Sequence, residues 1–275
     1  MAPSTTGNID LDGCEWPAAV EARAFGVKFG VRVTDAALLP LLLEQLPPGS
    51  RVCNKVRHRD ALFSIVSAAD GSGASLYADA VLVAEGCTQS ALLQAFAGQV
   101  RFDVARLAAR WTFVHAGVVE WHGRAILIPG ASYSGKSRLV QALVRAGARY
   151  YSDEFAPLDR RGRVYPFAKP LTLRSDDGGT VSIDVHELGG PRAARPLPVG
   201  VVISTRYVAG SRWNPTEVAG GRTVLSLLVN TVRAQIAPAQ VLRTLATVAK
   251  SAKTFDGERG EAAQTATDLL ARISA

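Results

Sequence analysis

The amino-acid sequence predicts an α/β protein with a small α/β module at the N-terminus and a larger domain built around a glycine-rich loop. Two observations carry this prediction: short strand-like runs alternate with apolar residues at helical spacing, and one glycine-rich segment lies between such a strand and such a helix. The chain has 275 residues and is 48% hydrophobic, enough for one or two buried cores. We divide it into a flexible N-terminus (residues 1–12), the small module (13–110) and the larger domain (111–275).

The small module is predicted from strand-like alternation and from helical spacing that ends at prolines and glycines. The expected elements are strands at Phe25–Val33, Ala61–Ser67 and Ser75–Val83, and helices at Asp35–Gln45 and from Thr88 or Gln89 to about Arg110. This module carries no recognisable catalytic motif, so the sequence does not indicate its role.

The larger domain begins with two strands joined by a hairpin turn at Gly123. Its expected strands are Phe113–Glu120, Arg124–Pro129, Arg149–Ser152, Val164–Phe167 and Val199–Ser204, and its expected helices are Ser137–Ala146, Thr223–Gln235, Pro238–Ser251 and Gly260–Ile273. The segment Ser175–Pro198 has little hydrophobic periodicity, which is as typical of a lid or substrate loop as of plain disorder.

The segment from Gly130 to Ser137 reads Gly-Ala-Ser-Tyr-Ser-Gly-Lys-Ser, a complete G-x-x-x-x-G-K-[ST] pattern between the predicted strand and helix. In such a loop, backbone N–H groups and the positive end of the helix surround phosphate oxygens. Lys136 is expected to reach the terminal phosphates, and the Ser137 hydroxyl to ligate Mg²⁺. The predicted nucleotide-binding residues are Gly130, Ala131, Ser132, Tyr133, Ser134, Gly135, Lys136, Ser137 and Arg138.

An acidic pair, Asp153 and Glu154, directly follows the strand after the loop helix. At the carboxyl edge of an α/β sheet, one carboxylate can accept a proton from an attacking hydroxyl while the other helps to hold Mg²⁺. A local helix cap or salt bridge is the alternative for Asp153. His115 lies in a strand near the loop, where a histidine is either a packed core residue or a catalytic one.

In this order, the histidine, the loop and the acidic pair resemble the catalytic domain of HPr kinase/phosphorylase, the bacterial protein-serine kinase family related to phosphoenolpyruvate carboxykinase. Gly130 follows His115 at an interval of fifteen positions, and Asp153 follows Ser137 at an interval of sixteen. The resemblance covers residues 112–175 and implies an ATP- and Mg²⁺-dependent serine kinase. It implies that Lys136 and Ser137 bind phosphate and Mg²⁺.

The same resemblance implies that Asp153 is the catalytic acid/base, that Glu154 is a Mg²⁺ ligand and that His115 tunes Asp153. The chain departs from the family at Glu154, where the family has aspartate, and it lacks the downstream Leu-Glu-x-Arg-Gly signature. Lys169 and Arg174 are the nearest local candidates for substrate contacts. The chain looks more like the shorter HPr-kinase-related proteins, some of which phosphorylate a serine of a lasso-peptide precursor.

Charge and cysteine content limit the partners. The net charge of +7 comes without a basic tail or an aromatic-basic signature, so we expect nucleotide and a protein or peptide hydroxyl acceptor as partners, and no nucleic acid. Three scattered cysteines and the lack of a long apolar run predict a cytoplasmic protein without a membrane segment; a homo-oligomer stays open. A nucleotide-binding regulatory module without phosphotransfer and a small-molecule kinase are the alternative functions.

Overall fold

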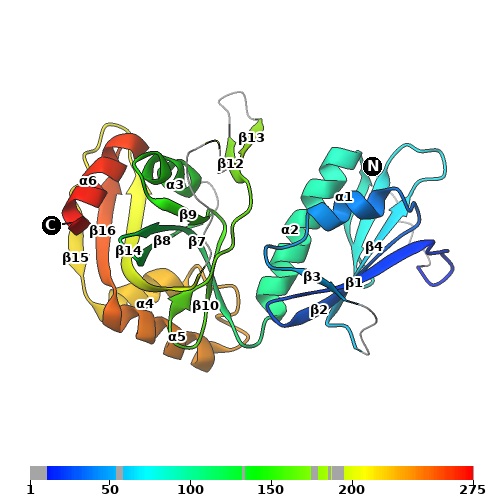
Figure 1. Cartoon of the computed structure of the whole chain (residues 1–275), viewed down its shortest axis with the longest axis horizontal. Helices are drawn as coiled ribbons and strands as arrows, with labels where there is room; N and C mark the ends of the chain where they lie inside the picture. Colours follow the sequence, from blue (N-terminus) through cyan, green and yellow to red (C-terminus); the bar gives the residue numbers. More distant parts are fainter. Residues whose placement is uncertain are drawn as a thin grey trace, which may run out of the picture. The chain divides into compact units, whose positions relative to one another are not determined.

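The computed structural model describes residues 11–53, 58–131, 134–174, 179–184, 187 and 195–274. The chain divides into two compact units, Met1–Leu107 and Ala108–Ala275 (Figure 1). Both units combine helices with a sheet, so the mixed α/β class expected from the sequence is observed. Within the described ranges, every helix is too short or too polar to cross a bilayer.

The first unit is a six-stranded sheet with the strand order β3-β1-β2-β4-β5-β6. Its elements are β1 (Ala18–Ala24), β2 (Val27–Val33), α1 (Leu38–Glu44), β3 (Arg51–Cys53), β4 (Ala61–Ser67), β5 (Ala74–Ala78), β6 (Val81–Cys87) and α2 (Gln89–Leu107). Strand β2 buries every second residue, and α2 packs against β5 and β6. The rings of Phe63 on β4 and Phe96 on α2 meet edge to face, with centroids 5.7 Å apart, so the helix and the sheet share one core.

The expected strand Ser75–Val83 is wrong, because the chain turns there and forms the hairpin β5–β6. The turn contains no glycine, asparagine or proline that would have marked it. Instead Asp79 takes a φ of 54, which aspartate tolerates better than most residues, and its carboxylate accepts a hydrogen bond of 3.0 Å from the Leu62 N–H. Strand β1, which the sequence did not predict, pairs with β2 through a turn at Phe25 and Gly26.

The second unit has an eight-stranded sheet with the order β11-β10-β7-β8-β14-β16-β15, in which β9 pairs with β7 and β11 also pairs with β14. Its strands are β7 (Thr112–Trp121), β8 (Arg124–Pro129), β9 (Arg149–Ser152), β10 (Phe155–Leu158), β11 (Arg163–Val164), β14 (Leu197–Tyr207), β15 (Thr216–Val218) and β16 (Lys253–Arg259). Its helices are α3 (Lys136–Arg145), α4 (Gly220–Leu228), α5 (Pro238–Ser251) and α6 (Ala262–Ser274). Strands β12 (Leu171–Arg174) and β13 (Thr180–Ile183) pair antiparallel in a separate two-stranded sheet.

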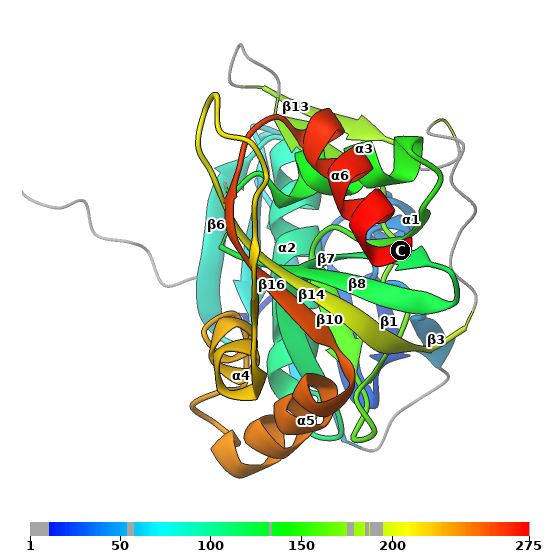
Figure 2. The ribbon, with the colours of Figure 1, turned by 90° about the vertical axis from the view of Figure 1, so that its left-hand side faces the viewer.

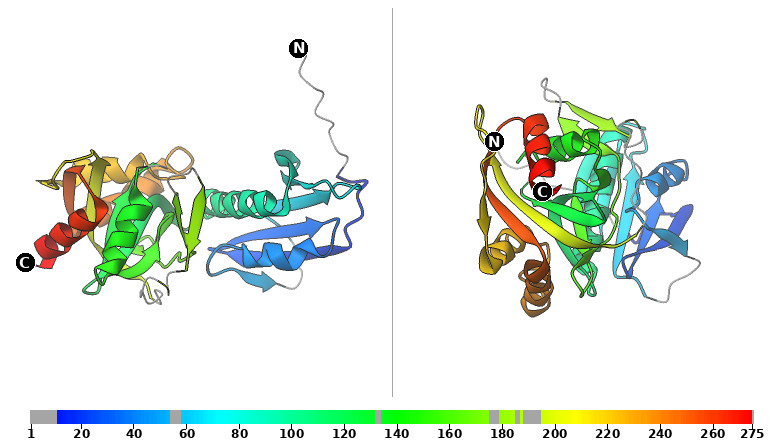
Figure 3. Two further views of the ribbon diagram at one scale, coloured as in Figure 1. Left: turned by 90° about the horizontal axis from the view of Figure 1, so that it is seen from above. Right: turned by 60° about the vertical axis from the view of Figure 1, so that its left-hand side comes forward.

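Helices cover both faces of this sheet, α3 and α6 on one face and α4 and α5 on the other (Figures 2 and 3). Alternate residues of β8 supply the two cores: Ile126 and Ile128 pack with α3 and α6, whereas Leu127 packs with α4 and α5. A Cβ at Gly117 on β7 would lie 2.5 Å from a methyl carbon of Val140. Glycine at that position therefore lets α3 lie close against the sheet, which positions the start of the helix.

Two predicted elements of the second unit are wrong in extent. The helix expected at Thr223–Gln235 ends at Leu228, because the next residues turn toward β7, where the Val232 N–H donates to the Phe113 carbonyl at 3.1 Å. The strand expected at Val164–Phe167 is only Arg163–Val164.

Strand β16 was not predicted, since its sequence Lys-Thr-Phe-Asp-Gly-Glu-Arg lacks apolar alternation. Most of Ser175–Pro198 lies outside the described residues, so the lid and disorder readings of that segment stay predictions; Thr180–Ile183 forms β13.

Candidate active site

The connection between β8 and α3 brings a helix N-terminus to the end of a sheet strand. Strand β8 ends at Pro129 and α3 begins at Lys136. Gly135, the N-cap residue, has φ 79, in the left-handed region that favours glycine. Because the first N–H groups of a helix have no partner within it and carry the positive end of the helix dipole, this geometry suits an anion. Ser132 and Tyr133 lie outside the described residues.

Lys136 is almost buried, with 6% of its surface exposed. Its ammonium donates hydrogen bonds of 2.7 Å to the carbonyl oxygens of Gly130 and Ala131, at the start of the loop. Burial lowers the pKa of Lys136 to about 8, although the carboxylates of Asp153 and Glu154 act in the opposite direction. The loop thus holds a partly desolvated ammonium next to the helix N-terminus.

Arg259, the last residue of β16, supports the loop from the side. Its guanidinium donates to the carbonyl oxygens of Ser134 at 3.3 Å and Gly135 at 3.0 Å, and only 3% of the residue is exposed. A Cβ at Gly135 would displace this guanidinium, and the φ of Gly135 independently favours glycine. No local sequence pattern marks Arg259, because its partner Gly135 lies 124 residues away along the chain.

The acidic pair forms the link between β9 and β10. Strand β10 pairs with the first half of β7 and β9 with the second half, both antiparallel. Strand β8 is also antiparallel to β7, so β8 and β9 run in the same direction and end at the same edge of the sheet. This topology puts Asp153 and Glu154 next to the loop, and the Ala116 N–H holds the link by donating to the Glu154 carbonyl at 3.1 Å.

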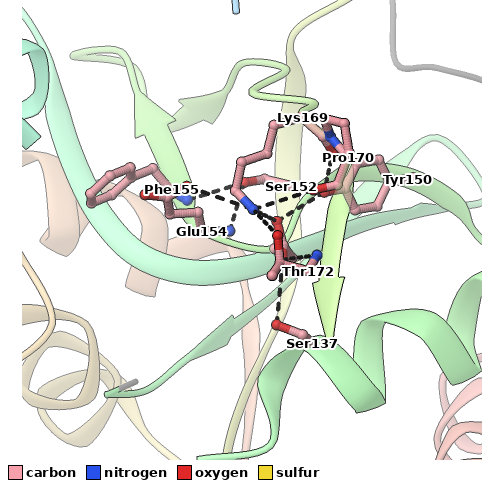
Figure 4. Close-up of polar contacts among 9 residues, drawn as sticks. Ser137, Tyr150, Ser152, Glu154, Phe155, Lys169, Pro170 and Thr172 are labelled. Atoms are coloured by element: carbon pink, nitrogen blue, oxygen red, sulfur yellow. Dashed lines mark hydrogen bonds and ion pairs between the residues drawn. The ribbon is translucent and has the colours of Figure 1, made fainter. Parts of the chain in front are cut away.

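Asp153 is 6% exposed, and its carboxylate accepts several hydrogen bonds. Figure 4 labels four of the residues that contact it, Ser137, Tyr150, Lys169 and Thr172. The Tyr150 hydroxyl lies 3.0 Å and the Lys169 ammonium 2.9 Å from Oδ1. The Thr172 N–H donates to Oδ2 at 3.3 Å, and the Ser137 hydroxyl donates to Oδ2 at 3.4 Å. Burial and the negative charge of Asp153 raise the pKa of Tyr150, which keeps its phenol a neutral donor. These donors fix the orientation of the carboxylate.

Lys169 bridges the two acidic residues, since its ammonium also lies 3.7 Å from Oε2 of Glu154. The sequence predicts Lys169 as a substrate contact; in this structure the ammonium is held at the acidic pair. Arg174, the other predicted substrate residue, is the last residue of β12, and its side chain lies outside the described part of the structure.

His115 lies on β7 directly opposite Phe155 of β10. The backbone N–H of His115 donates to the Asn230 carbonyl at 2.7 Å, and its backbone carbonyl accepts a hydrogen bond of 3.3 Å from the Gly130 N–H. Burial, with the nearby Lys136 ammonium, lowers the pKa of His115 to about 4, although Asp153 acts in the opposite direction. The imidazole is therefore neutral near pH 7 and can accept or donate a hydrogen bond.

A cavity of about 620 Å³ joins these groups. The loop and the start of α3 contribute Ser134, Gly135, Lys136, Ser137 and Arg138 to its lining. His115, Asp153, Glu154 and Lys169 also face it, and so do Tyr207, Arg259 and Glu261, which sequence reasoning missed. Gly130 and Ala131 instead line a neighbouring cavity. The structure thus brings most of the predicted residues together, while their individual roles stay predictions.

The chain has little similarity to proteins of known family or structure. No family model matches the chain, and no curated protein matches it in sequence. Among solved structures, the chain is similar to the Hpr(Ser) kinase/phosphatase from Coxiella burnetii, with 17% sequence identity and a TM-score of 0.36. The matched region covers 59% of this chain and 95% of that chain. A likeness this weak does not establish a shared fold.

Proposed function

We propose that this protein is an ATP- and Mg²⁺-dependent kinase that transfers the γ-phosphoryl group to a hydroxyl, with a serine of a protein or peptide as the acceptor. The observation that carries the proposal is the meeting of Ser137 and Asp153, whose side-chain oxygens lie 3.4 Å apart in the cavity that Lys136 also lines. A phosphate-binding helix start, a buried cation and an oriented carboxylate are the parts that phosphoryl transfer requires.

The nucleotide would bind with its phosphates at the start of α3. The Lys136 ammonium, now held by two loop carbonyls, is within the same loop and would turn to the terminal phosphate oxygens, where it offsets their negative charge. Arg259 would keep the loop backbone in place, because its guanidinium bonds the two carbonyls that precede α3. A rigid loop limits the reorganisation that phosphate binding requires.

The oxygen donors in the cavity suit Mg²⁺. Ser137 and Glu154 would hold the ion, and both offer the hard oxygen ligands that Mg²⁺ prefers. Phosphate oxygens and water would complete the coordination shell of the ion. When bound, the ion would neutralise charge on the phosphates and orient the γ-phosphoryl group.

Asp153 would act as the general base. As the acceptor oxygen forms its bond to the γ-phosphorus, the bond to the bridging oxygen of ADP breaks, and the hydroxyl proton passes to a carboxylate oxygen of Asp153. Tyr150 and the Thr172 N–H hold that carboxylate in one orientation. The neutral imidazole of His115 would position groups around Asp153 without adding positive charge.

The test is transfer of label from ATP labelled at the γ-phosphate, with and without Mg²⁺. The proposal expects label on a peptide or protein, and loss of that label when EDTA removes the metal. Label only in the small-molecule fraction would indicate a small-molecule kinase. ATP binding without any transfer would instead indicate a nucleotide-binding regulatory module, and either result would contradict the proposal.

A further inference from the structure

The cavity of about 620 Å³ has two chemically different ends. At one end Lys169 and Thr172 line it, and both bond the carboxylate of Asp153. The lining also contains Tyr207, the last residue of β14, and Glu261, two residues after the end of β16. These two residues belong neither to the loop nor to the acidic pair, so the cavity continues beyond the groups that would bind phosphate.

The order of the strands puts the two ends on opposite sides of the loop. Strand β8 lies between β7 and β14, and β16 follows β14 (Figure 2). Because β8, β14 and β16 are parallel, Tyr207 and Glu261 come from the same edge of the sheet as the loop. Strand β9 pairs with the far side of β7, which places it three strand spacings, about 14 Å, from β14. The acidic pair and Tyr207 therefore flank the loop.

Tyr207 and Glu261 form one unit at this second end. The Tyr207 hydroxyl donates a hydrogen bond of 2.8 Å to Oε1 of Glu261. The guanidinium carbon of Arg259, the register partner of Tyr207, lies 5.4 Å from the centroid of the tyrosine ring. Tyr207 is 46% exposed, more than any other described Phe, Tyr or Trp residue of the second unit. Two side chains thus hold the ring in place, while much of its surface stays open to a ligand.

These groups suit the nucleoside half of a nucleotide. An exposed aromatic ring can stack on a nucleobase. Glu261 is exposed, and since a carboxylate accepts about four hydrogen bonds, it can bind ribose hydroxyls in addition to Tyr207. Arg138 and Arg259 line the same cavity, so positive charge accompanies this carboxylate. The cavity volume also lies within the range of small-molecule sites.

The geometry of phosphoryl transfer determines which end receives the nucleoside. The attacking and leaving oxygens lie on opposite sides of the transferred phosphorus. The acceptor hydroxyl must contact Asp153 if that carboxylate takes its proton, so ADP extends from the phosphorus away from Asp153. Tyr207 and Glu261 lie on that side of the loop.

We infer that Tyr207 and Glu261 form the nucleoside subsite: the base stacks on the ring of Tyr207, and the ribose hydroxyls donate to the carboxylate of Glu261. This inference rests on the proposed function, because the position of Asp153 sets the direction of the bound nucleotide. The subsite recognises the face of a ring and the hydroxyls of a sugar. It therefore distinguishes a ribonucleotide from an inorganic polyphosphate and from a nucleotide without those hydroxyls.

The experiment is calorimetric titration of the full chain with Mg²⁺ and one of three ligands: the β,γ-imido analogue of ATP, its 2′,3′-dideoxy form, and inorganic tripolyphosphate. Tyr207→Ala should weaken binding of the ATP analogue by about tenfold or more, because the stacking surface is lost, and leave tripolyphosphate binding unchanged. Tyr207→Phe keeps the ring and should bind the ATP analogue within about threefold of the wild type. Phe102→Ala is the matched control, at a 47% exposed aromatic residue of the first unit that lines neither cavity, and should change none of the three affinities.

Glu261→Ala tests the sugar contact. The wild type should bind the ATP analogue about tenfold more tightly than its dideoxy form, and this ratio should fall to about one in the variant. Tripolyphosphate should bind the variant at least as tightly as the wild type, because a negative charge has been removed from the cavity. A carboxylate that acted only through its charge would instead repel all three ligands, and its removal would strengthen the binding of each.

Equal losses of affinity for the ATP analogue and for tripolyphosphate in Tyr207→Ala would mean that the ring only supports the fold, and would overturn the inference. Unchanged affinity for the ATP analogue in that variant would overturn it as well. Binding that follows the expected pattern without any transfer of label would contradict the kinase proposal and leave the subsite intact. Binding of none of the three ligands by the wild type would overturn both.

Discussion

The two units of this chain are both α/β, but they differ in where they bury charge. Within the described residues, the first unit buries one charged side chain, Asp103, whose carboxylate is bonded by Gln99 at 2.8 Å and by Arg106 at 2.8 Å on the same helix. The second unit buries Lys136, Asp153 and Arg259.

The three buried charges of the second unit come from separate elements: the start of α3, the β9–β10 link and the end of β16. All three line one cavity. Burying an unpaired charge lowers the free energy of unfolding. Buried charges are therefore concentrated at functional sites, where binding or catalysis requires them. The buried carboxylate of the first unit is bonded by side chains of its own helix α2, whereas the three buried charges of the second unit are arranged around a cavity that a ligand can enter.

The largest expected effect is on the rate of phosphoryl transfer, and it should distinguish the two buried aspartates, Asp153 and Asp103. Asp153→Asn should lower phosphoryl transfer by about 10²- to 10⁴-fold, because the amide cannot accept the proton, while ATP affinity stays near that of the wild type. Asp103→Asn should leave transfer unchanged and lower the free energy of unfolding by about 1–3 kcal/mol. Transfer rates, ATP binding by calorimetry and denaturant unfolding measure the three quantities. Near-normal turnover in Asp153→Asn would remove the assigned base.

The second largest expected effect is on nucleotide affinity, and it should distinguish two glycines with similar φ angles. Gly71 has φ 72 with open space around its Cβ position, whereas Gly135 has φ 79 and faces the guanidinium of Arg259. Gly71→Ala should cost only the backbone strain, about 1–2 kcal/mol of stability. Gly135→Ala should also displace Arg259 and weaken nucleotide binding by about 10- to 100-fold. Equal nucleotide affinity in both variants would mean that the loop does not bind phosphate in this geometry.

The smallest effect is a pH dependence of nucleotide affinity. Since the pKa of Lys136 is lowered to about 8, the ammonium is charged below that pH and loses its proton above it. Phosphate favours the charged form, so ATP affinity should fall as pH rises above about 8, by up to about tenfold per pH unit. Lys136→Arg should abolish this fall, because a guanidinium stays protonated throughout. Calorimetric titrations from pH 7 to about 9.5 compare the two slopes; parallel slopes would exclude Lys136 as the titrating group.

Local patterns were sufficient for much of the fold. Helix α5 and strands β4 and β9 have the bounds expected from apolar spacing and from flanking breakers. The errors arise where the local pattern is weak. The turn at Asp79 has a single turn-favouring residue and no glycine, asparagine or proline, and β16 is a strand because it pairs with β14 and β15, although its own sequence does not alternate.

The mixed α/β class, the glycine loop between a strand and a helix, and the acidic pair after the following strand were predictable from the sequence, because each depends on residues that are neighbours in the chain. Which distant groups meet at the site depends on the three-dimensional fold. Arg259 reaches the loop since β14 and β16 pair in parallel, and Lys169 reaches Asp153 through the segment before β12. Such contacts depend on strand order and register, which residues close together in the chain do not encode.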